Sequence, residues 1–169
     1  MKQTFRINYR SVNKTTLPLH SHPEYEIYYF HEGKCNYLIG DKIHTLTPGD
    51  LIIMHGMTLH RPKIFETEAY IRTVIHFNPE WARKWNEQML EIDLLRPFEE
   101  LRNHKVHLNE AEQKKFEHLL ASIQQVKSTK MAGCEYRLQL RMLDLLIYCR
   151  TFLIFRRIKK KVYNASFHL

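Results

Sequence analysis

The hydrophobic period of this 169-residue chain changes once, near residue 78. Before that point, short β-rich runs are separated by turn residues such as Gly40-Asp41 and Pro48-Gly49-Asp50. Short strands at close, regular spacing are typical of antiparallel barrels and jelly rolls. From Asn78-Pro79 onward, apolar residues recur at helical intervals, and Asn followed by Pro is a common helix start. We therefore predict a mainly β fold with C-terminal helices, in which an antiparallel β-barrel of the jelly-roll type precedes a helical region.

The change of period also gives the expected domain boundaries. We expect a β-barrel with an N-terminal arm at 1–77, a helical region at 78–157 and a basic tail at 158–169. The longest helix is expected to run from about Glu135 to Arg156. It carries two apolar stripes, and packing on a barrel needs only one of them. We therefore assign one stripe to a homodimer contact: Leu138, Met142, Leu145, Cys149 and Phe152.

Composition narrows the functional classes. The chain is 44% hydrophobic, enough to bury a core, but no apolar run approaches the roughly 20 residues of a membrane span. Its three cysteines are far apart, so we expect no disulfide framework and a cytoplasmic location. The net charge of +8 is concentrated in "RRIKKK" (156–161), which predicts a solvated tail with weak, non-specific DNA binding at most. No P-loop, dinucleotide fingerprint or nucleophile elbow is present, and we do not expect an enzyme.

Polar residues recur at alternate positions of the predicted strands. The segment "LHSHPEYEIYY" (residues 19–29) places histidine, glutamate and tyrosine at positions of one parity, and alternate residues of a strand share a face. A further histidine follows the second turn, and the strand "YIRTVIHF" (70–77) adds an arginine and a histidine of matching parity. The candidate ligand pocket therefore consists of His20, His22, Glu26, Tyr28, His60, Arg72 and His76.

Two chemistries fit these residues, and both remain open. Imidazoles and a carboxylate suit Zn, Fe, Mn or Ni, with His20, His22, Glu26 and His60 as the candidate ligands. The same groups beside aromatic rings suit a sugar or another polar metabolite, whose hydroxyls need donors and acceptors. In that second case no cofactor is expected.

Several of these motifs resemble a known family. His20-x-His22, followed by Glu26 and Gly33, is similar to the first cupin motif. "PGDLIIMHGMTLHRP" (48–62) resembles the second, with one extra residue before His60. Together with "IRTVIHFNPEW" (71–81), the pattern resembles the effector-binding domain of AraC-type transcriptional regulators over roughly residues 5–150.

That resemblance implies a cupin-like barrel that binds a small effector inside, with helices that dimerise. It also implies that DNA is bound through a separate helix-turn-helix domain, which we do not expect within this sequence. We expect the effector to order the N-terminal segment, residues 2–11, over the mouth of the barrel. The alternative is a stand-alone metal-dependent cupin enzyme, an oxygenase or an isomerase.

Overall fold

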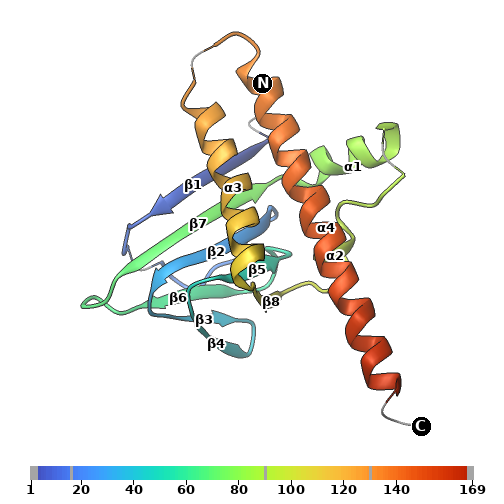
Figure 1. The fold of residues 1–169 in the computed structure, drawn as a ribbon. Helices are drawn as coiled ribbons and strands as arrows, with labels where there is room; N and C mark the ends of the chain where they lie inside the picture. The colour runs from blue at the N-terminus through green and yellow to red at the C-terminus, as the bar shows by residue number, and fades with distance from the viewer. Residues whose placement is uncertain (1–3, 16, 90, 130, 167–169) are drawn as a thin grey trace.

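The computed structural model describes residues 4–15, 17–89, 91–129 and 131–166 (Figure 1). Its strands are β1 (Phe5–Ser11), β2 (Tyr25–Gly33), β3 (Cys35–Ile39), β4 (Lys42–Leu46), β5 (Asp50–Met54), β6 (His60–Ile64), β7 (Tyr70–Phe77) and β8 (His104–His107). Its helices are α1 (Pro79–Met89), α2 (Arg96–Glu100), α3 (Glu110–Lys127) and α4 (Cys134–Ser166).

The strands form two antiparallel sheets. The larger sheet has the order β1-β7-β2-β5-β8, and the smaller one has the order β4-β3-β6. Side chains from both sheets meet in one buried cluster, which includes Tyr28 and Phe30 of the larger sheet and Tyr37 of the smaller. The two sheets therefore enclose a common interior, as the predicted barrel requires.

Strand β2 shows how the sequence specifies this arrangement. Tyr25, Ile27 and Tyr29 point to the outer face of the large sheet, where they join the core beneath the helices. The alternate residues Tyr28 and Phe30 point into the space between the sheets. Both faces of the strand are thus buried, which explains its nearly continuous run of large side chains.

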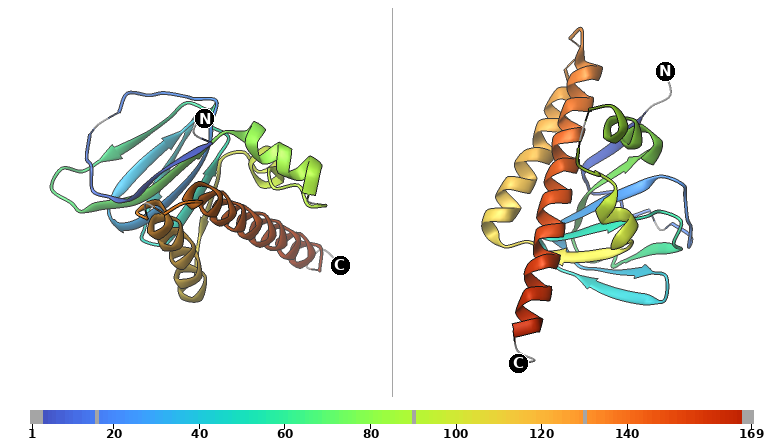
Figure 2. Two further views of the ribbon diagram at one scale, coloured as in Figure 1. Left: turned by 90° about the horizontal axis from the view of Figure 1, so that it is seen from above. Right: turned by 90° about the vertical axis from the view of Figure 1, so that its right-hand side faces the viewer.

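Helices α3 and α4 pack against each other and cover the outer face of the large sheet (Figures 1 and 2). Helix α3 begins with a capping box, in which the Asn109 side chain accepts from the Glu112 amide and the Glu112 side chain accepts from the Asn109 amide. Helix α1 begins at Pro79, and the Asn78 side chain accepts from the amide of Glu80 at 2.9 Å. The predicted fold class and the predicted step from sheet to helix are confirmed.

The predicted end of the last helix was wrong. Helix α4 continues to Ser166, so a helix occupies residues 158–166, where we expected a tail. Two of the basic residues hold this helix to the domain: Arg156 donates to the Glu112 carboxylate at 2.6 Å, and Arg157 pairs with Glu100. Residues 167–169 lie outside the described part of the chain.

The N-terminal segment also differs from the expectation. Residues 5–11 form the edge strand β1, which pairs with β7, and Ile7 is buried in the core. Residues 5–11 are therefore part of the large sheet and do not form the arm over the mouth that we predicted, and residues 2 and 3 of that arm lie outside the described part of the chain.

The stripe assigned to a dimer contact lies inside this chain. Met142, Leu145 and Cys149 are each 0% exposed and belong to the core between α4 and the large sheet. Leu138 and Phe152 are partly buried against the same core. The assignment to a partner chain was wrong for Met142, Leu145 and Cys149, because this chain's own core covers them, and it stays a prediction for the partly buried Leu138 and Phe152.

Candidate functional site

Four histidines and one glutamate meet at one end of the space between the sheets. Glu26 comes from β2, His60 from β6 and His76 from β7. His20 and His22 lie in the segment before β2, where His20 forms a β-bridge with His60.

Gly56 makes this meeting of loops possible. Its φ is +84°, and a side chain there would put a Cβ 1.9 Å from the carbonyl oxygen of Glu24. The Gly56 carbonyl accepts from the His22 amide at 3.0 Å, so the loop after β5 lies directly against the segment that carries His22.

The carboxylate of Glu26 is the centre of the cluster. Its Oε2 lies 3.2 Å from Nε2 of His22, 3.0 Å from Nε2 of His76 and 3.7 Å from Nε2 of His60. Burial alone would raise the pKa of Glu26, but hydrogen bonds with His22 and His76, and the nearby His60, outweigh burial and lower the pKa to about 2. Glu26 is therefore an ionised carboxylate that is only 2% exposed.

Backbone carbonyls fix the orientation of three of the imidazoles. Nδ1 of His20 lies 2.8 Å from the carbonyl oxygen of Pro18, Nδ1 of His22 lies 3.0 Å from that of Glu24, and Nδ1 of His60 lies 2.8 Å from that of Thr58. A carbonyl oxygen only accepts, so each Nδ1 carries the proton. In the neutral rings, Nε2 then presents a lone pair.

With Nδ1 protonated, His22 and Glu26 need a proton or a cation between them. The Nε2 lone pair of a neutral His22 would face the Glu26 carboxylate, and two acceptors at 3.2 Å need a proton or a cation between them. The hydrogen bond with Glu26 raises the pKa of His22 in spite of burial, which favours the protonated ring. Burial lowers the pKa of His60, which stays neutral, and its buried Nε2 has no hydrogen-bond partner among the described residues.

The donor set fits a metal ion in two overlapping ways. His20, His22 and His60 form one group whose ligand atoms lie within 4.8 Å of one another, and His22, Glu26 and His76 form another. The four residues predicted as ligands thus fall into two groups that share His22. The sequence-based ligand set omitted His76, although its parity had placed it in the candidate pocket.

Tyr28 and Arg72 lie farther along the interior. The Tyr28 hydroxyl donates to that of Tyr70 at 3.1 Å, within the buried cluster. The Arg72 guanidinium lies over the Tyr70 ring, 4.8 Å from its centroid, and donates to the carbonyl of Ser11 at 2.9 Å. The structure therefore places these two predicted pocket residues in a layer of tyrosines next to the histidines. Tyr37, which the sequence analysis did not include, links the tyrosines to the histidines. Its ring is stacked with that of His60, with 6.3 Å between the two ring centroids.

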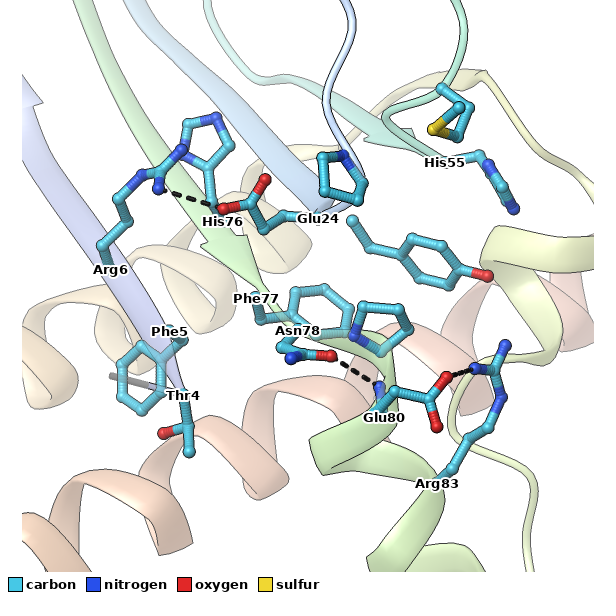
Figure 3. A pocket seen from close by; sticks show the side chains of 14 residues that line it. Thr4, Phe5, Arg6, Glu24, His55, His76, Phe77, Asn78, Glu80 and Arg83 are labelled. Atoms are coloured by element: carbon cyan, nitrogen blue, oxygen red, sulfur yellow. Dashed lines mark hydrogen bonds and ion pairs between the residues drawn. The ribbon is translucent and has the colours of Figure 1, made fainter. Parts of the chain in front are cut away.

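A groove of ≈600 Å³ adjoins the cluster and is lined by residues of β1, of the end of β7 and of the start of α1, among others (Figure 3). His76 lines this groove and also contacts Glu26, so it is a wall between the groove and the histidine cluster. Arg6 and Glu24 lie beside His76 in the groove, 3.2 Å from each other.

Comparison with known proteins agrees with this architecture. Residues 4–141 match the model of the AraC-like ligand binding domain family. The chain belongs to this family. A search of curated proteins finds no match to the sequence.

The solved structures that resemble this AraC-like domain include ToxT from Vibrio cholerae. The apo form of a ToxT variant has a TM-score of 0.59 and 13% identity, over 95% of this chain and 57% of that chain. ToxT bound to (E)-4-(8-methylnaphthalen-1-yl)but-3-enoic acid has a TM-score of 0.53 and 12% identity, over 94% and 58% of the two chains. ToxT with a bound unsaturated fatty acid has a TM-score of 0.51 and 11% identity, over 95% and 57%. This AraC-like domain thus spans less than two thirds of each ToxT chain, and at these identities the likeness establishes the fold alone.

The described helices of this AraC-like domain do not resemble membrane spans. Within the described residues, none combines the length and the apolar character that crossing a bilayer requires.

Proposed function

We propose that this AraC-like domain senses a small polar metabolite, with a sugar as the first class to test. The ligand would bind at the histidine end of the barrel and control DNA binding by a separate domain, in the cytoplasm. The observation that carries the proposal is unused hydrogen-bonding capacity: the buried Nε2 of His60 and the buried Nδ1 of His76 have no partner among the described residues. An unsatisfied buried polar atom costs about 1–3 kcal/mol, which a ligand hydroxyl would relieve.

The chemistry of the cluster favours hydroxyl groups. Glu26 accepts hydrogen bonds, the lone pair of His60 Nε2 accepts another, and the ring of Tyr37 offers an apolar face beside them. A sugar carries both hydroxyls and C–H faces, which suits such a mixture. A hydrocarbon chain would leave the buried Nε2 of His60 and the buried Nδ1 of His76 without a partner. The polarity of this cluster therefore supports a different ligand class from the fatty acid bound by ToxT.

Thermal unfolding against a panel of monosaccharides and polyols tests this function. A ligand present at 100 times its Kd stabilises the folded state by about 2.7 kcal/mol, which raises Tm by roughly 5–10 °C for a domain of this size. We expect Glu26→Gln and His60→Phe to abolish the rise. His118→Gln, at an exposed position of α3, is the matched control and should retain it. A panel that leaves Tm unchanged, or a rise that survives both site variants, would contradict the proposal.

A metal-dependent role is the second candidate, and the three Nδ1–carbonyl hydrogen bonds favour it. They orient His20, His22 and His60 as metal-bound histidines are commonly oriented, and a metal ion at His22 would replace the proton between its Nε2 and Glu26. These three residues would hold Zn, Fe, Mn or Ni, while His76 would orient the Glu26 carboxylate. When bound, such a metal acts as a Lewis acid at an open coordination position, which is the chemistry of the alternative cupin oxygenase or isomerase.

Elemental analysis of protein purified without added metal separates the two candidates. Near-stoichiometric transition metal that is lost on His20→Ala, but kept on His118→Ala, would support the metal-dependent role. Metal-free protein that still binds a sugar would support the metabolite sensor.

Dimerisation remains part of the proposal, on a different surface. Among the α4 side chains that the structure describes, the exposed apolar ones include Leu140, Phe155 and Ile158. We expect these residues to contact a second copy of the chain. Sedimentation of wild type and of Leu140→Glu at micromolar concentration tests this, because a dimer that is unaffected by the charge would place the contact elsewhere.

A further inference from the structure

The groove beside His76 has an arginine–glutamate ion pair on each of two sides (Figure 3). Arg6 pairs with Glu24 at one side, and Arg83 pairs with Glu80 at the other. Both pairs are in contact with solvent, with side chains between 30% and 68% exposed. Apolar side chains of Phe5, Pro23, Met57 and Pro79 also line the groove.

The two ion pairs can exchange partners with a ligand at little cost. Exposed pairs contribute only about 0–1 kcal/mol to stability. Each guanidinium has five N–H groups, and Arg6 gives only one hydrogen bond to Glu24. Each pair therefore offers donors and acceptors together.

The balance of charge selects the ligand. The groove is lined by two arginines and two glutamates, so a ligand with one net charge would meet a like charge at either side. A zwitterion has a carboxylate for an arginine and an ammonium for a glutamate. The apolar side chains between the pairs would accept its hydrocarbon part.

We propose that this groove is a second ligand site, which binds a small zwitterion of the α-amino acid class. Its carboxylate pairs with Arg6 or Arg83, and its ammonium pairs with Glu24 or Glu80. The groove meets the histidine cluster at His76, which lines it, and at Glu24, whose carbonyl oxygen holds His22. Its charged walls, Arg6, Glu80 and Arg83, do not belong to that cluster, so the proposed zwitterion site does not rest on the proposed sugar site.

Contacts behind the groove give this binding a route to the last helix. Arg83 and Tyr25 both donate to the carboxylate of Glu99 on α2, at 3.0 Å and 3.4 Å. The next residue, Glu100, pairs with Arg157 of α4. A ligand carboxylate that draws Arg83 away from Glu99 would loosen α2, which packs against α4.

Calorimetric titration with three related probes tests the charge requirement. L-Phenylalanine has both charges, 3-phenylpropionate lacks the ammonium, and 2-phenylethylamine lacks the carboxylate. We expect L-phenylalanine to bind, and each analogue to bind at least about tenfold more weakly, which corresponds to about 1.4 kcal/mol. L-Leucine and L-lysine are titrated beside it to vary the side chain.

Variants locate the binding. At least one of the variants Arg83→Gln and Glu24→Gln should weaken L-phenylalanine binding about tenfold, according to the side of the groove that holds the two charges of the ligand. Lys34→Gln removes a comparable exposed ion pair with Glu68, outside the groove lining, and should have no effect. All three positions are partly or fully exposed, so the variants are expected to fold, which their circular dichroism verifies.

Three outcomes would overturn the proposal. One is a Kd above about 1 mM for all three amino acids. Another is equal affinity for 3-phenylpropionate or for 2-phenylethylamine. The third is undiminished binding in both groove variants. A sugar-induced rise in Tm would be unaffected by any of these outcomes, because that test reports on the barrel interior.

Discussion

Among its described residues the domain buries two carboxylates, Glu26 and Asp50, and their surroundings differ in one respect. Asp50 is 0% exposed and is fully paired: it accepts from the Thr47 amide at 2.9 Å, from Lys105 at 2.9 Å and from His107 at 3.0 Å. Glu26 is surrounded by imidazoles, two of which keep a buried nitrogen without a partner among the described residues. Burial therefore does not distinguish the two carboxylates. Nitrogens without a hydrogen-bond partner distinguish them, because such nitrogens surround Glu26, our candidate site, and not Asp50.

The largest effect is expected at Asp50. Asp50→Ala removes the group that ties β8 to β5, and losing one partner of a buried ion pair costs about 3–5 kcal/mol. Urea unfolding measures this loss, and ligand binding at the histidine cluster should persist in the folded fraction. The control is Glu68→Ala, an exposed partner of Lys34, which should cost less than about 1 kcal/mol. If the two variants were equally stable, Asp50 would not have the structural role assigned to it.

The strand that Asp50 holds was not predictable from the sequence. Residues 104–107 lie between helical segments, and a four-residue strand has too short a pattern to be recognised beside them. Its partner strand β5 comes much earlier in the chain, since the paired residues Asp50 and Lys105 are 55 positions apart in the sequence. By contrast, the capping box at Asn109 was predictable because all its parts lie within four residues.

The candidate site was predictable in part for the same reason. His20, His22 and Glu26 share a parity within one short segment, so the sequence alone predicts that they lie together. The distance from Glu26 to His76 depends on how β2 pairs with β7, and the distance from Glu26 to His60 depends on how the smaller sheet faces the larger one. No local pattern records either arrangement. The buried stripe on α4 shows the same limit, because periodicity identifies an apolar face without identifying its partner.

Glu26 is expected to have a smaller, pH-dependent effect. Its pKa is about 2 in the folded state against an ordinary value of 4.5, so its stabilising contribution is present above pH 4.5 and is lost as the pH falls toward 2. The full shift corresponds to about 3 kcal/mol. Unfolding free energies across this pH range should fall more steeply for wild type than for Glu26→Gln. The exposed Glu66→Gln is the control and should keep the wild-type slope. Parallel slopes for wild type and Glu26→Gln would mean that the histidines do not hold Glu26 as the distances indicate.

The smallest effect is expected at Tyr28, and it decides how far the ligand site extends. Tyr28→Phe removes the hydrogen bond to the Tyr70 hydroxyl, which should cost about 1 kcal/mol of unfolding free energy. Because Tyr28 lies in the tyrosine layer, the sugar-induced rise in Tm should be unchanged. Tyr136→Phe, at a position that is 72% exposed, is the control for loss of a hydroxyl and should alter neither quantity. If Tyr28→Phe also abolished the rise in Tm, the ligand would reach past the histidines to Tyr28, and the pocket would have the depth that the sequence alone predicted.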